Sequence, residues 1–210
     1  MNNIINIGSR LECFFTGRLV DEEKTTAEYR MHNPVRRETV MVHDEPWEGS
    51  ISCYHVIIKD GDIYRMYYRG GSGVTLRSFI CYAESTDCLH WVKPELGLFD
   101  FNGSKDNNII IDESLHPNID NFFVFKDTNP ACPPERLFKA VSLYNFPTEN
   151  GPDPEGGLRV YYSADGIHFR KGELLLDADT GAYDSMNVIF WDEAYVKYRC
   201  YFRGFHPAPE

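Results

Sequence analysis

One short pattern occurs twice in this chain and constrains its fold more than any other feature. Residues 85–91 and 163–169 share the form S-x-D-x-x-H-aromatic. A second pattern, Y-R-M-Y-Y-R-G at residues 64–70, returns as Y-R-C-Y-F-R-G at residues 198–204, and residues 138–142 are a weaker copy. Recurrence at roughly 60–78 residues is typical of β-propeller blades that carry loop insertions. The chain should therefore contain consecutive copies of one antiparallel sheet.

The third copy stops after its second strand. Residues 187–191 and 196–202 fit two strands, yet no further S-x-D segment follows them before residue 210. A propeller needs about four blades to close, so the repeats predict an all-β fold that is an incomplete five-bladed β-propeller, with about two and a half blades of four-stranded antiparallel sheets. The third sheet should expose strand edges at residues 196–204, which favour self-association. The missing blades would come from a longer gene product or from a partner chain.

Strand patterns fill most of the chain. Short β-branched and aromatic runs are bounded by Gly, Asp, Asn and Pro, while helical periodicity is almost missing. Residues 9–20 should form one or two strands and residues 34–42 an extended arm. The Asp-Gly pair inside Lys59–Asp62 predicts a two-residue hairpin turn, and His90–Val92 should begin the fourth strand of the first blade. We expect one domain over residues 1–210, with N-terminal strands and arm at 1–43, the first blade at 44–93, a connection and the second blade at 94–171, and the start of a third blade at 172–210.

The charge and composition disfavour several classes of partner. The formal net charge is −11, with 14% aromatic and 25% charged residues. This composition argues against disorder, and the negative charge disfavours nucleic acid and anionic membrane surfaces but suits a neutral ligand such as a sugar. The chain has no run of 18 apolar residues, and its first fifteen residues lack the features of a secretory signal. We therefore expect a cytoplasmic protein, unless the N-terminus has been trimmed.

The cysteines do not indicate a metal centre. None of the six forms a C-x-x-C pair, so the spacing favours neither zinc nor a disulfide. Cys53, Cys81 and Cys200 lie in apolar strand patterns, where cysteine usually serves as a small buried hydrophobe. We expect no metal and no cofactor.

Five acids repeat at positions that have a structural explanation. Asp60, Asp127 and Asp192 lie between the first and second strands of successive units, where an aspartate can hydrogen-bond its own backbone. Asp87 and Asp165 belong to the S-x-D segments, whose Ser and Asp side chains can bind nearby backbone N–H groups. We assign all five to the fold rather than to chemistry.

A different set of acids precedes the first strand of each unit. In a propeller the innermost strands line the central channel, so residues just before them should meet at one mouth, one strand length or roughly 17–20 Å from the turn acids. Carboxylates gathered there repel one another unless one keeps its proton, which yields a general acid beside an ionised base or nucleophile. The candidate catalytic acids are Asp44, Glu48, Asp120 and Asp184. Side chains next to them that could bind a sugar are Trp47, Asn118, Asn121, Tyr183 and Asn187.

The S-x-D-G-x-x-aromatic segments, the Y-R-M-Y-Y-R-G strand and the PWEGS loop at residues 46–50 together resemble a known family. They are similar to the five-bladed β-propeller glycoside hydrolases of the family-32 and family-43 type, over nearly the whole chain. The resemblance implies catalytic acids of the order Asp, Asp and Glu from the first three blades. This chain offers Glu48 or Asp44, then Asp120 and Asp184, so the first and third identities differ. The R-D-P motif of the second blade is absent, since Lys126-Asp127-Thr128 takes a turn position.

The expected function is glycoside hydrolysis by the parent propeller, with the four candidate acids as the catalytic set and Trp47 as an aromatic platform. One alternative is a carbohydrate-binding module without turnover. Another is a glycoside phosphorylase, which would need Arg, Lys or His at the channel mouth to hold phosphate, and Arg69 and Arg203 would favour it if they faced the channel. Two carboxylates about 5–10 Å apart would fit hydrolysis, whereas wider spacing would fit binding alone.

Overall fold

The chain divides into two compact units, Met1–Glu38 and Thr39–Glu210. The computed structural model describes residues 4–10, 12–13, 17–71, 77–116, 119–144 and 155–204. In the described part of the first unit, the 3-10 helix η1 (Gly17–Leu19) is the regular element. The strands predicted within residues 9–20 are wrong for the described positions, which are exposed or half-buried and have no neighbouring strand to complete their backbone hydrogen bonds. Residues 34–42 contain no regular secondary structure, as expected of an arm.

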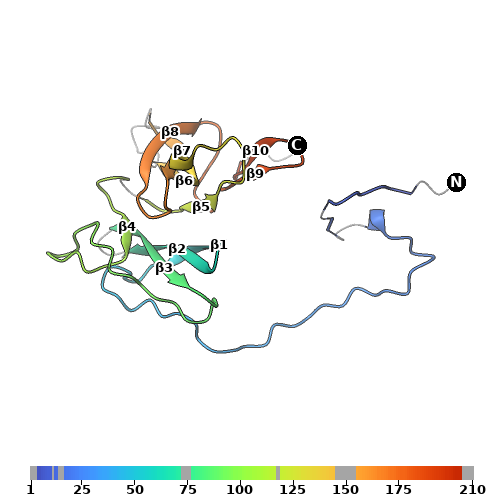
Figure 1. The fold of residues 1–210 in the computed structure, drawn as a ribbon, viewed down its shortest axis with the longest axis horizontal. Helices are drawn as coiled ribbons and strands as arrows, with labels where there is room; N and C mark the ends of the chain where they lie inside the picture. The colour runs from blue at the N-terminus through green and yellow to red at the C-terminus, as the bar shows by residue number, and fades with distance from the viewer. Residues whose placement is uncertain are drawn as a thin grey trace, which may run out of the picture. The chain divides into compact units, whose positions relative to one another are not determined.

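The second unit begins with a four-stranded antiparallel sheet (Figure 1). Its strands, in spatial order, are β1 (Cys53–Asp60), β2 (Ile63–Gly71), β3 (Ser78–Ser85) and β4 (Ile109–Ile111). Asp60 pairs with Ile63, so the two-residue hairpin loop is Gly61-Asp62, one residue later than predicted. Gly61 has a φ of +62°, which the absence of a Cβ atom makes inexpensive.

The fourth strand of this sheet does not begin at His90–Val92. Val92 forms only an isolated bridge with Glu84, and β4 comes from within the predicted connection at 94–120. The three isoleucines of β4 are all buried, so they form a short continuous apolar run without the alternation that marks a half-exposed strand. The first sheet therefore extends to Ile111 rather than ending at residue 93.

The second sheet repeats the same plan. Its spatial order is β5 (Phe123–Lys126), β6 (Phe138–Tyr144), β7 (Gly157–Ser163) and β8 (Arg170–Asp177), with the 3-10 helix η2 (Pro134–Arg136) between β5 and β6. This sheet runs to Asp177 rather than to residue 171. The third sheet is a hairpin of β9 (Val188–Asp192) and β10 (Lys197–Tyr201), and β10 is an open edge within the described residues.

The three sheets are connected through their first strands and their apolar faces. β1 contacts β5, and β5 contacts β9. One buried cluster, which includes Tyr67, Ile80, Val124 and Tyr161, lies between the first and second sheets, and a second cluster joins the second sheet to Ile189 of the third. The opposite face of the first sheet is covered by five side chains from its own flanking loops: Met41, Trp47, Trp91, Phe99 and Phe101. The described residues are thus all-β, with no α-helix and no closed sheet.

The S-x-D segments form two turns with the same hydrogen bonds. In the first, Ser85 Oγ accepts from the N–H groups of Asp87 and Cys88, while Asp87 Oδ1 accepts from Leu89 and His90 at 2.8 Å. His90 Nδ1 lies 2.7 Å from Asp87 Oδ2, and this imidazole, followed by the backbone N–H groups, holds the pKa of Asp87 below its usual range. Residues 163–169 repeat every one of these bonds. The motif therefore recurs because it satisfies the backbone of a tight turn.

The turn acids also have a shared structural contact. Each forms an ion pair with the basic residue that is second or third in the following strand, as in the 2.7 Å contact between Asp60 Oδ2 and Arg65 Nε. The three pairs are Asp60–Arg65, Asp127–Lys139 and Asp192–Arg199. Asp60 also binds Lys126 of the second sheet, and Asp127 accepts a hydrogen bond from Tyr198 of the third. These acids stabilise the hairpins and join neighbouring sheets.

No helix among the described residues is long and apolar enough to cross a membrane.

Candidate functional site

The structure brings Asp120 and Asp184 to one place, between the starts of the first, second and third sheets. Asp120 precedes β5 and forms an ion pair with Arg69, which reaches over from β2. Asp184 precedes β9 and forms an ion pair with Arg203, just after β10. Arg69 also donates to Ser78 Oγ at 2.9 Å, which fixes the guanidinium against the first sheet. Each carboxylate thus lies against one arginine of the repeated Y-R-x-Y-x-R-G motif.

The two carboxylates are close enough to influence each other electrostatically. Burial raises the pKa of Asp120 above its usual range, Arg69 partly offsets this, and the negative charge of Asp184 raises it further. The Asp120 side chain is only 16% exposed, whereas that of Asp184 is 43% exposed. The environment therefore makes the Asp120 carboxyl easier to protonate than an ordinary aspartate.

Tyr54 lies beside both acids. It occupies a bulge in β1, where the register shifts between Cys53 and Val56, and its φ of 54° is unusual for a residue other than glycine. Its hydroxyl lies 3.5 Å from the backbone oxygen of Asp184. Burial raises the pKa of Tyr54, and the charge of Asp120 raises it further, so the phenol stays protonated as a hydrogen-bond donor. The bulge therefore places a neutral hydroxyl near both acids, where it donates to the backbone oxygen of Asp184.

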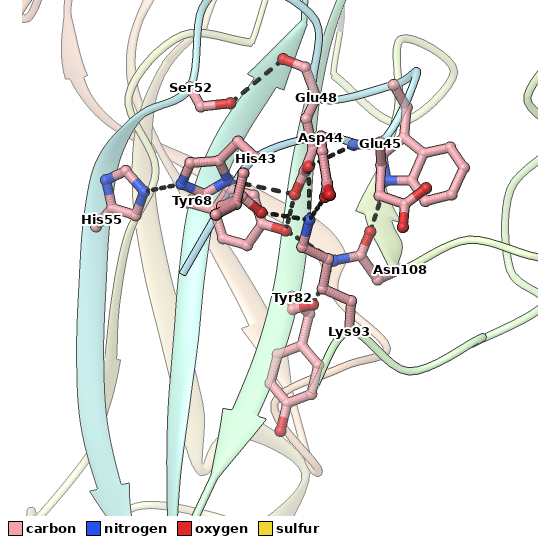
Figure 2. A network of polar contacts seen from close by, with 12 residues as sticks. His43, Asp44, Glu45, Glu48, Ser52, His55, Tyr68, Tyr82, Lys93 and Asn108 are labelled. Atoms are coloured by element: carbon pink, nitrogen blue, oxygen red, sulfur yellow. Dashed lines mark hydrogen bonds and ion pairs between the residues drawn. The ribbon is translucent and has the colours of Figure 1, made fainter. Parts of the chain in front are cut away.

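Glu48 and Asp44 lie in a separate network around Lys93 (Figure 2). The Glu48 carboxylate is fully buried and accepts from Lys93 Nζ at 2.7 Å, from Tyr68 Oη at 2.5 Å and from the Glu45 backbone N–H at 2.9 Å. Burial raises the pKa of Glu48, but the hydrogen bonds from Lys93 and Tyr68 outweigh it, so the pKa is lowered. Asp44, with its side chain 72% exposed, is the second partner of Lys93. Among the described residues, no contact joins the Glu48 carboxylate to Asp120.

Two histidines extend this network towards solvent. His43 Nδ1 lies 3.3 Å from Glu48 Oε1, and its Nε2 lies 2.9 Å from Nε2 of His55 (Figure 2). His55 is exposed and stacks on Tyr68, with ring centroids 5.6 Å apart. Burial, followed by the neighbouring His43, lowers the pKa of His55. The histidines, Lys93 and Tyr68 were missed by the sequence analysis, because no sequence spacing connects positions that meet only after the first sheet and its flanking loops have folded.

The predicted sugar-binding residues are placed differently from one another. Trp47 donates its indole N–H to Asn108 Oδ1 at 2.6 Å and borders a cleft of about 320 Å³ with Phe79, Phe101 and Arg77. Its ring meets Phe101 edge-on at 5.9 Å. An aromatic cleft of this size lies at the small end of ligand pockets.

The amide candidates are used inside the protein. Asn121 is fully buried, donates to the backbone oxygen of Tyr183 at 2.7 Å and accepts from the Leu143 N–H at 3.2 Å. Asn187 is also buried and donates to the same Tyr183 oxygen, while the Tyr183 hydroxyl donates to the backbone of Asp177. These side chains hold the segment that carries Asp184. Asn118 lies outside the described residues.

The described residues contain no group of three or more His, Cys, Asp or Glu side chains arranged to hold a metal ion. The described cysteines are free thiols: Cys81 is buried, Cys53, Cys88, Cys132 and Cys200 are intermediate, and Cys13 is exposed. Comparison of the chain with protein-family models, with curated proteins and with solved structures gave no match.

Proposed function

We propose that this chain carries the acid pair of a carbohydrate-active β-propeller of the glycoside hydrolase type. The observation that carries the proposal is the position of Asp120 and Asp184, two acids that precede the first strands of successive sheets, each form an ion pair with an arginine and lie close enough to interact electrostatically. Contacts between β1 and β5 and between β5 and β9 support an arrangement of the sheets as blades around one axis. The resemblance of the repeats to family-32 and family-43 enzymes supports the same assignment.

In this proposal Asp120 is the proton donor. A general acid must protonate the leaving oxygen when a glycosidic bond breaks, and burial raises the pKa of Asp120 in the direction that this role needs. Asp184, which forms an ion pair with Arg203, acts as base or nucleophile. Tyr54 donates a hydrogen bond within the site. The Trp47 cleft, on the opposite face of the first sheet, is a separate aromatic surface that a sugar ring could contact. Glu48 and Asp44 form the separate network around Lys93 and take no part in the proton transfer.

A second candidate function is glycoside phosphorolysis, in which phosphate takes the place of water. The observation that favours it is the position of Arg69 and Arg203 against the two acids. A guanidinium group binds phosphate through two parallel N–H donors. Two such groups beside a carboxylate pair are suited to an anionic co-substrate, provided that their present ion pairs with Asp120 and Asp184 open when it binds.

The test measures cleavage of a panel of nitrophenyl glycosides by the whole chain, with and without inorganic phosphate. Asp120→Asn and Asp184→Asn should each lower kcat by about 100-fold or more, without a change in circular dichroism. Asp62→Asn, at an exposed hairpin position, is the matched control and should leave kcat unchanged. Dependence on phosphate would select phosphorolysis, and sugar binding without cleavage would select the binding module. A kcat equal to that of the wild type in both Asp120→Asn and Asp184→Asn would refute the acid pair.

A further inference from the structure

The first and third sheets present the same pair of side chains on the same strand position. Arg65 and Tyr67 of β2 correspond to Arg199 and Tyr201 of β10 in the repeated motif. The correspondence extends to the backbone partner, because Arg65 Nε binds Asp60 and Arg199 Nε binds Asp192 in the same way. The two sheets therefore hold the pair in the same local geometry.

In the first sheet this pair has a specific task. Arg65 donates to the backbone oxygen of Asp165 at 3.0 Å, and Tyr67 donates to the backbone oxygen of Gly166 at 2.9 Å. Both acceptors belong to the S-A-D-G turn of the second sheet. Tyr67 is fully buried as a result. The pair thus recognises the exposed carbonyl groups of a neighbouring S-x-D-G turn.

In the third sheet the same face is uncovered. Tyr201 is 58% exposed, in contrast to the buried Tyr67, and it stacks on Phe190, which is 37% exposed. Arg199 lies over the ring of Tyr195, itself 63% exposed. No S-x-D-G turn contacts this face within the described residues. An apolar surface rimmed by donors is typical of a protein interface.

We propose that the face of β9–β10 formed by Phe190, Arg199 and Tyr201 binds an S-x-D-G-x-x-aromatic turn of a further β-sheet, as Arg65 and Tyr67 bind the second sheet. The partner must have a glycine as the fourth residue of its S-x-D-G turn, at the position that Gly166 occupies in the second sheet. A Cβ atom on Gly166 would lie 2.7 Å from Tyr67 Oη and 3.0 Å from the Phe138 ring, so only glycine allows this approach.

The glycine requirement disfavours a second copy of this chain as the occupant. The other turn of the chain has Cys88 at the fourth position, in the same left-handed conformation, with φ of 62° against 78° for Gly166. Its Cβ atom would occupy the space that Tyr201 Oη needs. The indole of Trp91 also donates to the Cys88 oxygen at 3.1 Å, where the tyrosine hydroxyl would donate.

The first test uses a backbone-cyclised peptide of residues 160–171, which contains the S-A-D-G turn, titrated into the whole chain by fluorescence anisotropy. The control peptide carries Gly166→Cys, which reproduces the first turn. We expect saturable binding of the first peptide and at least about tenfold weaker binding of the control. Tyr201→Phe should weaken binding by a similar factor because it removes the hydroxyl donor and keeps the ring. Arg199→Lys should do the same because it keeps the charge but loses the guanidinium, which can bind Asp192 through Nε and the turn through another nitrogen. Met31→Ala, at an exposed site in the first unit, should have no effect.

The second test converts the chain's own turn. Cys88→Gly should make the chain associate head to tail in analytical ultracentrifugation, and adding Tyr201→Phe should reverse this, while the wild type should not associate through this face. Peptide binding alone, with the specificity above, supports the proposal even when Cys88→Gly stays monomeric. Wild-type association that Tyr201→Phe abolishes would identify a second copy as the occupant and overturn the glycine requirement. Absence of both peptide binding and Cys88→Gly association would overturn the docking face itself.

Discussion

Replacing Glu48 with glutamine should destabilise the protein far more than replacing Asp44 with asparagine, although both acids bind Lys93. Glu48 is fully buried and its two oxygens accept from Lys93, Tyr68 and the Glu45 N–H. Glutamine keeps one acceptor oxygen, but its NH₂ group is a donor and would face the donors that the second carboxylate oxygen accepts from in the wild type. Breaking a buried charge pair on one side costs about 3–5 kcal/mol. Because Lys93 keeps Asp44 and the Val42 oxygen as acceptors, a cost just below this range is expected, about 2–3 kcal/mol.

Asp44→Asn provides the comparison, since its carboxylate is 72% exposed and solvent screens its ion pair with Lys93, so only a small loss of stability is expected. Urea unfolding followed by circular dichroism gives the free energy of unfolding for both variants at pH 7. Adding Lys93→Met to Glu48→Gln should recover part of the loss, because neither charge is then left buried without its partner.

The result that would refute this reasoning is a Glu48→Gln variant as stable as Asp44→Asn. If that variant also lost turnover, Glu48 would be a catalytic acid in direct contact with substrate, as its place before β1 predicted. If the Glu48→Gln variant kept both its stability and its turnover, the hydrogen bonds of the buried network would contribute nothing measurable to the free energy of unfolding.

Two further outcomes follow from buried positions elsewhere. Gly166→Ala should cost about 1–3 kcal/mol more than Gly97→Ala in the same unfolding assay, because both glycines have positive φ but only a Cβ on Gly166 meets Tyr67 Oη; equal costs would mean that the turn shifts freely. Burial lowers the pKa of His116 from 6.5 to about 3, so the unfolded chain takes up this proton first and stability should fall as pH drops from about 6.5 towards 3. His116→Gln should flatten that part of the pH profile, and an unchanged slope would contradict the buried neutral histidine.

The repeats made most of the strands predictable, because their signals are local. The S-x-D turns cap their own backbone, and the β1–β2 hairpin needs only a glycine with positive φ. By contrast, β4 was missed because Ile109–Ile111 is buried on both faces and pairs with β3 across a long loop. The strands expected within residues 9–20 failed for the opposite reason. An apolar run becomes a strand only where a neighbouring strand completes its hydrogen bonds.

The residues of the candidate site could be predicted only where the order of the strands by itself fixes their position. Asp120 and Asp184 precede the first strands of successive sheets, and neighbouring first strands bring them together. Glu48 also precedes a first strand and was predicted at the same site, but its carboxylate points into the buried network around Lys93 instead. That choice depends on Lys93, which lies 45 positions away in the sequence and meets Glu48 only after the first sheet has formed.

The repeated motif explains how one strand places its two arginines against two different acids. Arg65 and Arg69 are four residues apart on β2, so the pleat points both to the same face, about 13 Å apart along the strand. Arg65 lies at the hairpin end, where it binds Asp60 and the turn of the next sheet, whereas Arg69 lies at the opposite end against Asp120. The end of β2 that an acid lies near therefore decides which of the two arginines it contacts. An aspartate in a hairpin turn meets the arginine that joins sheets, and an aspartate before a first strand meets the arginine at the acid pair.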